Sequence, residues 1–293
     1  MHSKLVTGLF ALSTSVAAHI IPHTTQSNQP SPRTVTSRHC GEPEPSEMQL
    51  KHALKLSSVE SSRLAADPAA YDFQIDVEVF VHVISSSPEA HITNEQIVDQ
   101  IAYLNQAFNP YDVSFNHNHT DFVVNGNWSV SGGDFAMKQN LRRGSYRDLN
   151  LYYLEQVISD GDQLLGYCHF PEPGVTEDSE TFIRDGCVIN AQTVPGGTNA
   201  PFNLGGTTVH EVGHWFGLYH TFQGGCEGGD EVWDTPRQES PSSGCPVLRD
   251  SCPGSPGIDP VHNFMDYSDD ACYESFSLGQ RRRMHSTWSD YRM

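Results

Sequence analysis

The chain has 293 residues, of which 17 are Lys or Arg and 36 are Asp or Glu, so its formal charge is −19. This acidic excess argues against a nucleic-acid partner, because contacts to phosphates need clustered basic side chains. After the first 20 residues no stretch is long and apolar enough to cross a bilayer, whereas a 37% share of hydrophobic residues suffices for a folded core. The 15 histidines are many for this length and indicate that a metal site should be sought.

The first 18 residues have the layout of a secretory signal peptide. Lys4 precedes an apolar stretch, and the small residues Val16-Ala17-Ala18 offer a cleavage site. The alternative, an N-terminal helix of the folded protein, fits less well because a polar tract follows. Two N-glycosylation sequons agree with secretion and with an extracellular location. They begin at Asn118 and Asn127.

Residues 19–70 are rich in Ser, Thr, Pro and Glu, which predicts a prosegment or flexible leader in front of a folded domain over residues 71–293. Within this leader the pattern allows a short helix around Glu47–Leu64. Every second residue from Ile75 to Val83 is Ile or Val. This alternation predicts a strand with one buried face at the start of the domain.

Helices and strands alternate after this strand. Thr93 and Gln96 form a capping box that opens a helix, and Asn109-Pro110 ends it. We then expect short strands at 113–116 and 121–124, a helix at 136–143, strands at 150–157 and 187–194, and a helix after the glycine-rich segment 195–206. This order predicts an α+β sheet domain.

The irregular stretch at 224–262 is crowded with Gly, Pro, Cys and Asp, and it can be ordered only by disulfides or a cation. Disulfides are favoured over a zinc finger, because the cysteines of this region include no closely spaced pair. These cysteines are Cys226, Cys245, Cys252 and Cys272. Sequence spacing does not fix how the cysteines pair.

The segment HEVGHWFGLYH carries the pattern of a metal site. On a helix, His210 and His214 project from one face and can bind the same ion, while Glu211 can reach a metal-bound water without ligating the metal. Gly217 permits the left-handed turn that ends a helix and brings His220 back as a third ligand. Three imidazoles leave zinc an open position, as in catalytic sites. The alternative is a core helix whose histidines are only hydrogen-bonded.

This segment matches the HExxHxxGxxH signature, and the chain resembles the metzincin metallopeptidases. Residues 263–268, NFMDYS, resemble the methionine turn that lies beneath the zinc in that family. Together with the preceding GD-x-x-x-DTP, they make the chain similar to the pappalysin group, in particular its secreted fungal members, over roughly residues 75–290. Residue 221 is Thr, which differs from astacins, reprolysins and serralysins. Another metzincin subgroup would change the specificity but not the mechanism.

The resemblance implies a metzincin-like α+β catalytic domain over residues 71–293. It comprises a twisted, mostly parallel sheet with backing and active-site helices, followed by a small irregular C-terminal subdomain stapled by disulfides. The implied activity is that of a zinc endopeptidase, with Glu211 as general base for a zinc-activated water. Tyr267 would stabilise the oxyanion, with plain packing as its alternative, and Met265 would pack under the zinc. We expect a secreted monomer that cuts extracellular proteins or peptides.

The resemblance also implies a calcium ion near the active site. Asp230, Asp234 and Thr235 offer oxygen ligands for it, and a solvated acidic loop is the alternative. The family's crossed disulfide pattern, carried over, pairs Cys226 with Cys252 and Cys245 with Cys272. Cys168–Cys187 is expected as a third bridge.

Cys40 stands apart from the other six cysteines. Residues 38–43, RHCGEP, resemble the cysteine switch of some metzincin proforms, in which a thiolate fills the open zinc position. Residues 19–70 would then be the inhibitory prosegment of a zymogen. The alternative is an unpaired or intermolecularly bonded cysteine. A binding or adhesion protein without activity is disfavoured, because the three histidines and Glu211 are intact.

Overall fold

The computed structural model describes residues 1, 38, 40–42, 45–67, 69–131 and 134–293. Apart from Met1, the expected signal peptide lies outside the described residues, as does the leader before Arg38. The described residues from Arg38 to Met293 belong to one compact unit. In this part of the chain no helix is long and apolar enough to cross a membrane.

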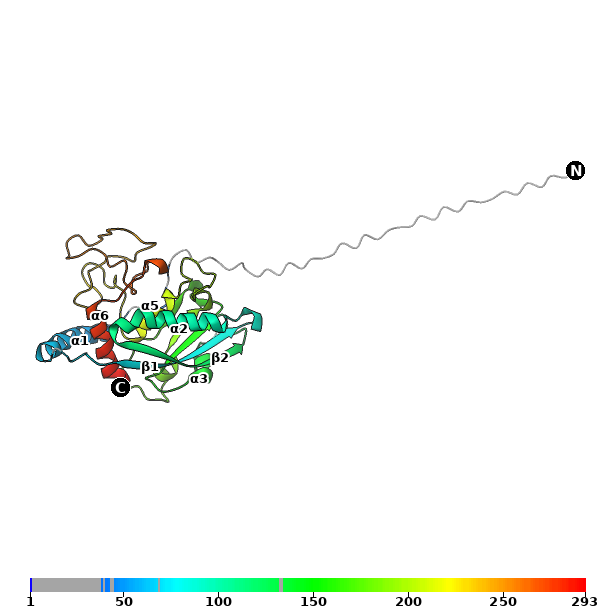
Figure 1. Cartoon of the computed structure of the whole chain (residues 1–293), viewed down its shortest axis with the longest axis horizontal. Helices are drawn as coiled ribbons and strands as arrows, with labels where there is room; N and C mark the ends of the chain where they lie inside the picture. Colours follow the sequence, from blue (N-terminus) through cyan, green and yellow to red (C-terminus); the bar gives the residue numbers. More distant parts are fainter. Residues whose placement is uncertain (2–37, 39, 43–44, 68, 132–133) are drawn as a thin grey trace. The chain divides into compact units, whose positions relative to one another are not determined.

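A five-stranded sheet in the order β2-β1-β3-β7-β6 forms the centre of this unit (Figure 1). The first four of these strands are parallel, and β6 runs antiparallel to β7 at the edge. The strands are β1 Ile75–Ser85, β2 Val113–Val124, β3 Leu149–Leu154, β6 Gly166–Cys168 and β7 Cys187–Asn190. A separate antiparallel pair consists of β4 Val157–Ser159 and β5 Asp162–Leu164. The expected α+β class with a mostly parallel sheet is confirmed.

Helices cover both faces of this sheet. Helices α2 and α5 lie on one face and share the main hydrophobic core with β1, whereas α3 lies on the other face (Figure 1). The helices are α1 Glu47–Ala66, α2 Asn94–Phe108, α3 Asp134–Leu141, α4 Glu180–Arg184, α5 Gly206–Trp215 and α6 Leu278–Thr287, followed by a π-helical turn at Trp288–Arg292. Short 3-10 turns occur at Pro88–Ala90, Asn109–Tyr111, Ala191–Thr193 and Asp270–Cys272.

Local signals placed several of these elements correctly. Thr93 and Gln96 form the capping box of α2, and a second box at Ser46 begins α1. The expectation of two short strands over 113–124 was wrong, because β2 is one continuous strand with a bulge after His117. Its polar middle is tolerated because β2 is an edge strand whose side chains after Phe115 are exposed or only half-buried.

Strand β1 differs from the expected half-buried pattern in its second half. His82 and Ile84, on the face expected to be polar, are fully buried. The cause is the second hydrophobic cluster, in which Met137 of α3 packs with Ile84 and Tyr152 on that face. The sheet that carries the site is therefore covered on both faces, as is usual for parallel strands.

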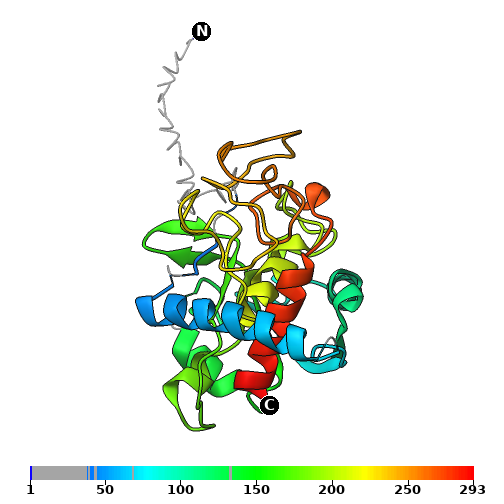
Figure 2. The same ribbon diagram turned by 90° about the vertical axis from the view of Figure 1, so that its left-hand side faces the viewer.

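Disulfides staple the irregular C-terminal part of the chain. The structure contains the bonds Cys168–Cys187, Cys226–Cys252 and Cys245–Cys272. The first joins β6 to β7, and the other two hold the loops between His220 and α6. Helix α6 itself has no apolar face in sequence, and it lies beneath α1, which crosses it (Figure 2).

Candidate metal centre

Helix α5 and the turn after it bring three histidines together. His210 and His214 lie one turn apart and are fully buried. Gly217 follows the helix with φ +85°, in the left-handed region that glycine adopts without strain. The chain reverses there and places His220 beside the helix. The Nε2 atom of His214 is then 3.2 Å from that of His210 and 3.1 Å from that of His220.

Backbone carbonyls orient two of these rings. Nδ1 of His210 donates to the carbonyl of Phe264, and Nδ1 of His214 donates to the carbonyl of Leu218, each over 2.7 Å. This tautomer leaves Nε2 with a free lone pair pointing at the common centre. Burial lowers the pKa of all three histidines, that of His214 to about 4. They are therefore neutral, which is the form that binds a metal ion.

Glu211 faces the same centre from the next position of α5. Its carboxylate is buried, and burial raises the pKa of Glu211 to about 8. The free thiol of Cys40 lies 3.3 Å from its Oε2 atom. The Sγ atom of Cys40 and the ligand atoms of the three histidines, His210, His214 and His220, all lie within 4.8 Å of one another. The structure thus brings together the expected ligands, the expected base and the leader's cysteine.

Residues 263–268, inside the loop that the Cys245–Cys272 disulfide closes, pack against the histidines of the site. Met265 is fully buried and packs against Gly213, where a side chain would collide with its sulfur. The ring of Tyr267 lies 5.0 Å from that of His220, between ring centroids, and its hydroxyl accepts a hydrogen bond of 3.2 Å from the amide of Cys40. Burial raises the pKa of Tyr267 well above its usual value, so the phenol keeps its proton as a donor.

The leader crosses the site along the edge of the sheet. Cys40 forms a parallel bridge with Gly166 of β6, and the amide of Gly41 donates to the Gly166 carbonyl over 2.8 Å. The carboxylate of Glu42 accepts a hydrogen bond of 3.1 Å from the amide of Cys168. An extended segment added to a sheet edge in this way is a common mode of peptide binding.

Arg38 fills a closed pocket beside the metal centre. Its guanidinium is buried, donates to the hydroxyl of Thr207 over 3.1 Å, and forms an ion pair of 2.5 Å with Asp270. The rings of Phe202 and Tyr273 flank it, each with a centroid 4.9 Å from the guanidinium carbon. The pocket therefore offers a carboxylate and two aromatic faces to one cation.

Asp270 has a second structural task at this pocket. Its Oδ2 atom accepts hydrogen bonds from the amides of Leu204, at 2.8 Å, and Gly206, at 3.2 Å, at the start of α5. The sequence pattern predicts no role for Asp270, and it marks Arg38 only as part of the segment RHCGEP that resembles the cysteine switch.

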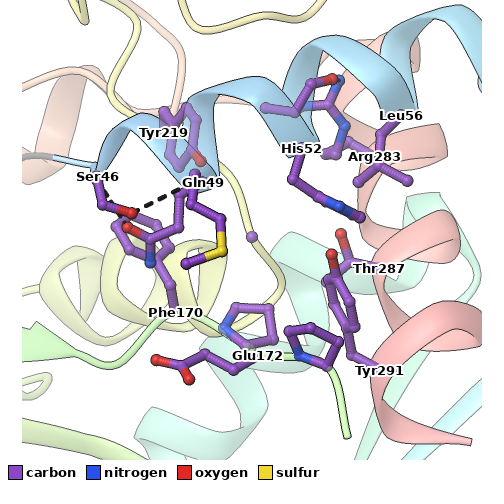
Figure 3. Close-up of a pocket in the computed structure, with 15 residues that line it drawn as sticks. Ser46, Gln49, His52, Leu56, Phe170, Glu172, Tyr219, Arg283, Thr287 and Tyr291 are labelled. Carbon is purple, nitrogen blue, oxygen red and sulfur yellow. Dashed lines mark hydrogen bonds between the residues drawn. The ribbon is translucent and has the colours of Figure 1, made fainter.

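Helix α1 anchors the leader on the far side of the site. Glu60 of α1 forms a buried ion pair of 2.8 Å with Arg283 of α6, and Ala53 packs against Phe170 and Tyr219. A cavity of about 600 Å³ lies between α1 and the domain, and the rings of His52 and Tyr291 lie next to each other in its lining, with centroids 5.1 Å apart (Figure 3). The leader thus contacts the domain through Arg38, through residues 40–42 and through α1.

The acidic residues proposed for calcium lie in the loop before α6. Asp230 is buried, and its Oδ2 atom has no hydrogen-bond partner among the described residues. Burial raises the pKa of Asp230 to about 7. Asp234 instead accepts hydrogen bonds from the hydroxyl of Ser277, at 2.7 Å, and the amide of Gly279, at 2.8 Å. Thr235 follows it in the same loop.

Both sequons lie at the surface. Asn118 is exposed on β2, where its amide donates to Glu78 over 2.9 Å, and Asn127 is exposed in the turn that follows the strand. Either side chain is accessible in this fold.

The sequence model of the Peptidase M43 family, described as pregnancy-associated plasma protein-A, matches residues 139–289. The chain belongs to this pappalysin family. An extracellular metalloprotease of Verticillium alfalfae is 51% identical over 257 residues, which cover 86% of this chain and 89% of that protein. An extracellular metalloprotease of Neurospora crassa is 48% identical over 263 residues, or 88% of this chain and 90% of that protein. The chain is therefore a metalloprotease, and this family implies a metal, typically zinc.

A solved structure supports the same assignment. Mature mirolysin of Tannerella forsythia, in complex with a cleaved peptide, is 28% identical with a TM-score of 0.60. The alignment covers 73% of this chain and 92% of mirolysin. The metzincin fold expected for this pappalysin is confirmed.

Proposed function

We propose that this pappalysin is a secreted zinc endopeptidase that hydrolyses peptide bonds of extracellular proteins through a zinc-activated water. His210, His214 and His220 would hold the ion. The observation that carries the proposal is the convergence of their neutral, buried Nε2 atoms next to the carboxylate of Glu211. Three imidazoles and one open position suit catalytic zinc.

We assign separate roles in the reaction to the residues around this centre. Zinc, when bound, polarises a water molecule and the scissile carbonyl. Glu211 would accept a proton from the water and pass it to the leaving amine, because a cation held by the histidines would favour the ionised carboxylate that burial alone disfavours. The protonated phenol of Tyr267 donates a hydrogen bond to the developing oxyanion. Met265 forms the apolar floor under the histidines.

Residues 19–70 are proposed as an inhibitory prosegment, and residues 71–293 as the catalytic domain. Cys40 Sγ faces the open metal position, which makes it a candidate fourth ligand that excludes water. The prosegment is held there by the ion pair of Arg38 with Asp270 and that of Glu60 with Arg283. The uncleaved chain would then be inactive, because the prosegment occupies the space that substrate and water need at the metal centre.

Replacing Cys40 with Ser should speed maturation of the secreted chain, because a hydroxyl is a weaker zinc ligand than a thiolate. Pulse–chase analysis of the secreted protein would measure how fast the leader is lost. Cys40→Ser combined with Glu211→Ala is the control, since processing by the protein itself requires Glu211. An unchanged rate in Cys40→Ser would count against the switch.

The pocket of Arg38 supports a proposal about specificity. A leader side chain that fills a closed pocket next to the metal centre occupies the place of a substrate side chain. Asp270 and the rings of Phe202 and Tyr273 would recognise an arginine of the substrate, because they satisfy its charge and both of its faces. We therefore propose cleavage next to arginine.

Further proposals concern the secreted form. Asp230, Asp234 and Thr235 are candidate calcium ligands, supported by the unpartnered buried oxygen of Asp230. We also propose removal of residues 1–18 as a signal peptide, glycosylation at Asn118 and Asn127, and a monomeric enzyme.

Metal removal tests the proposed activity. The purified, processed protein should cleave casein and lose this activity with a zinc chelator, and zinc should restore cleavage. If casein cleavage persists in the chelator, or if the protein contains no zinc, the proposed function is wrong.

Full recovery of both activity and Tm with zinc alone after EDTA treatment would contradict the calcium proposal.

A further inference from the structure

The end of helix α5 rests on a buried ion-pair cluster away from the open side of the metal centre. The guanidinium of Arg292, next to last in the sequence, lies 2.9 Å from Oδ1 and 3.3 Å from Oδ2 of Asp185. The indole nitrogen of Trp215, the last residue of α5, donates to Asp185 over 3.2 Å. Arg292 and Asp185 are both almost completely buried.

Arg292 also contacts the helix end directly. It donates to the carbonyl of Trp215 over 3.1 Å, and its guanidinium carbon lies 3.6 Å from the centroid of the Trp215 ring. The last carbonyls of a helix lack partners within the helix, and a cation there interacts favourably with the helix dipole. Trp215 thus has its carbonyl, its indole N–H and its ring face all fixed by the Arg292–Asp185 pair.

The contact between Arg292 and Trp215 lies next to the histidines in sequence. Trp215 directly follows His214, and the chain reverses at Gly217 to reach His220. The angle at which the helix ends therefore sets the position of His220 relative to the two helical histidines. Movement at Trp215 would change the separation of the three Nε2 atoms.

We propose that Arg292 is a positioning residue that fixes the end of α5 and so sets the affinity of the three histidines for zinc. The inference rests on the proposed zinc site. It goes beyond that site because Arg292 contacts neither the histidines nor the cleft.

Arg142 offers a matched control. Its guanidinium is also buried and lies 3.4 Å from the Asp185 carboxylate. Replacing Arg142 therefore removes the other of the two cations that pair with Asp185. Arg142 also donates to the backbone carbonyls of Asp185 and Ser145 and lies over the ring of Phe182, none of which belongs to α5. Arg292→Gln and Arg142→Gln therefore disturb the same ion-pair cluster, but only the first frees the helix end.

Competition with a fluorescent zinc chelator, performed on the full chain, tests the inference. Both variants should lower the Tm by about 10 °C or more, because each leaves Asp185 one buried cation instead of two, and Arg292→Gln should lower it further because it also loses its bonds to the carbonyls of Tyr146 and Trp215. Arg292→Gln should also raise the zinc Kd about tenfold, as loss of support around metal ligands does, whereas Arg142→Gln should change it less than about twofold. If Arg292→Gln does not fold, Arg292→Lys, which keeps the charge but not the forked geometry, replaces it in the same comparison.

The possible outcomes distinguish failure of the role proposed for Arg292 from failure of the proposed zinc site. Equal zinc affinity in the wild type and the Arg292 variant would overturn the inference, as would an equal loss of affinity in both variants. Absence of zinc from the wild type would overturn the proposed function and the inference with it.

Discussion

Glu211→Ala will lower kcat for peptide hydrolysis about a thousandfold, because a positioned general base contributes on the order of 10² to 10⁴ in rate. The carboxylate of Glu211 lies beside the three histidines but is not needed to complete their ligand set. Substrate binding should change little, so the loss should appear in kcat more than in KM. Initial rates on a fluorogenic peptide would measure it.

The design of this experiment has to separate catalysis from maturation. A variant that cannot process itself keeps Cys40 over the site, and its low rate would then reflect latency. We therefore compare Glu211→Ala with its parent in a Cys40→Ser background, after identical trimming by an added protease. Full activity in the Glu211 variant would rule out the proposed base.

Asp270→Asn will remove the preference for arginine. The ion pair between Asp270 and a guanidinium is fully buried, and hydrogen bonds to charged groups contribute about 1.5–3 kcal/mol. We expect kcat/KM for an arginine peptide to fall about 100-fold, which corresponds to about 2.7 kcal/mol. The matched peptide with glutamine in place of arginine should be cleaved at an almost unchanged rate.

The neighbouring acid provides the control for this prediction. Asp269→Asn removes the same charge one residue away and should keep the arginine preference. In Asp270→Asn the remaining amide oxygen can still accept the backbone hydrogen bonds of Leu204 and Gly206, so the start of α5 should be preserved. Equal losses on both peptides would contradict a role in specificity and indicate a structural one.

The metal centre could be predicted from the sequence because its parts are local. His210, Glu211 and His214 share a helix, and Gly217 and His220 follow within six residues of it. Helical periodicity and the conformational freedom of one glycine are enough to bring the histidines together. The same holds for α2, whose capping box is formed by residues three apart.

The remaining features depend on pairings between distant residues. Arg38 and Asp270 are separated by 232 residues and Arg292 and Asp185 by 107, so no sequence spacing relates them. Helix α6 could not be foreseen because Arg283, a residue usually exposed, is buried by its ion pair with Glu60. The strand break expected near His117 was wrong for a similar reason, since an edge strand accepts polar residues that an isolated pattern assigns to a turn.

The zinc content of the Glu211→Ala protein, measured beside that of its parent by elemental analysis, shows whether Glu211 acts as the general base or as a metal ligand. If three histidines hold the ion and Glu211 only transfers protons, both proteins will contain about one zinc per chain while only the parent cleaves peptide. Loss of zinc from the variant would make Glu211 a ligand, and a parent without zinc would contradict the proposed mechanism altogether.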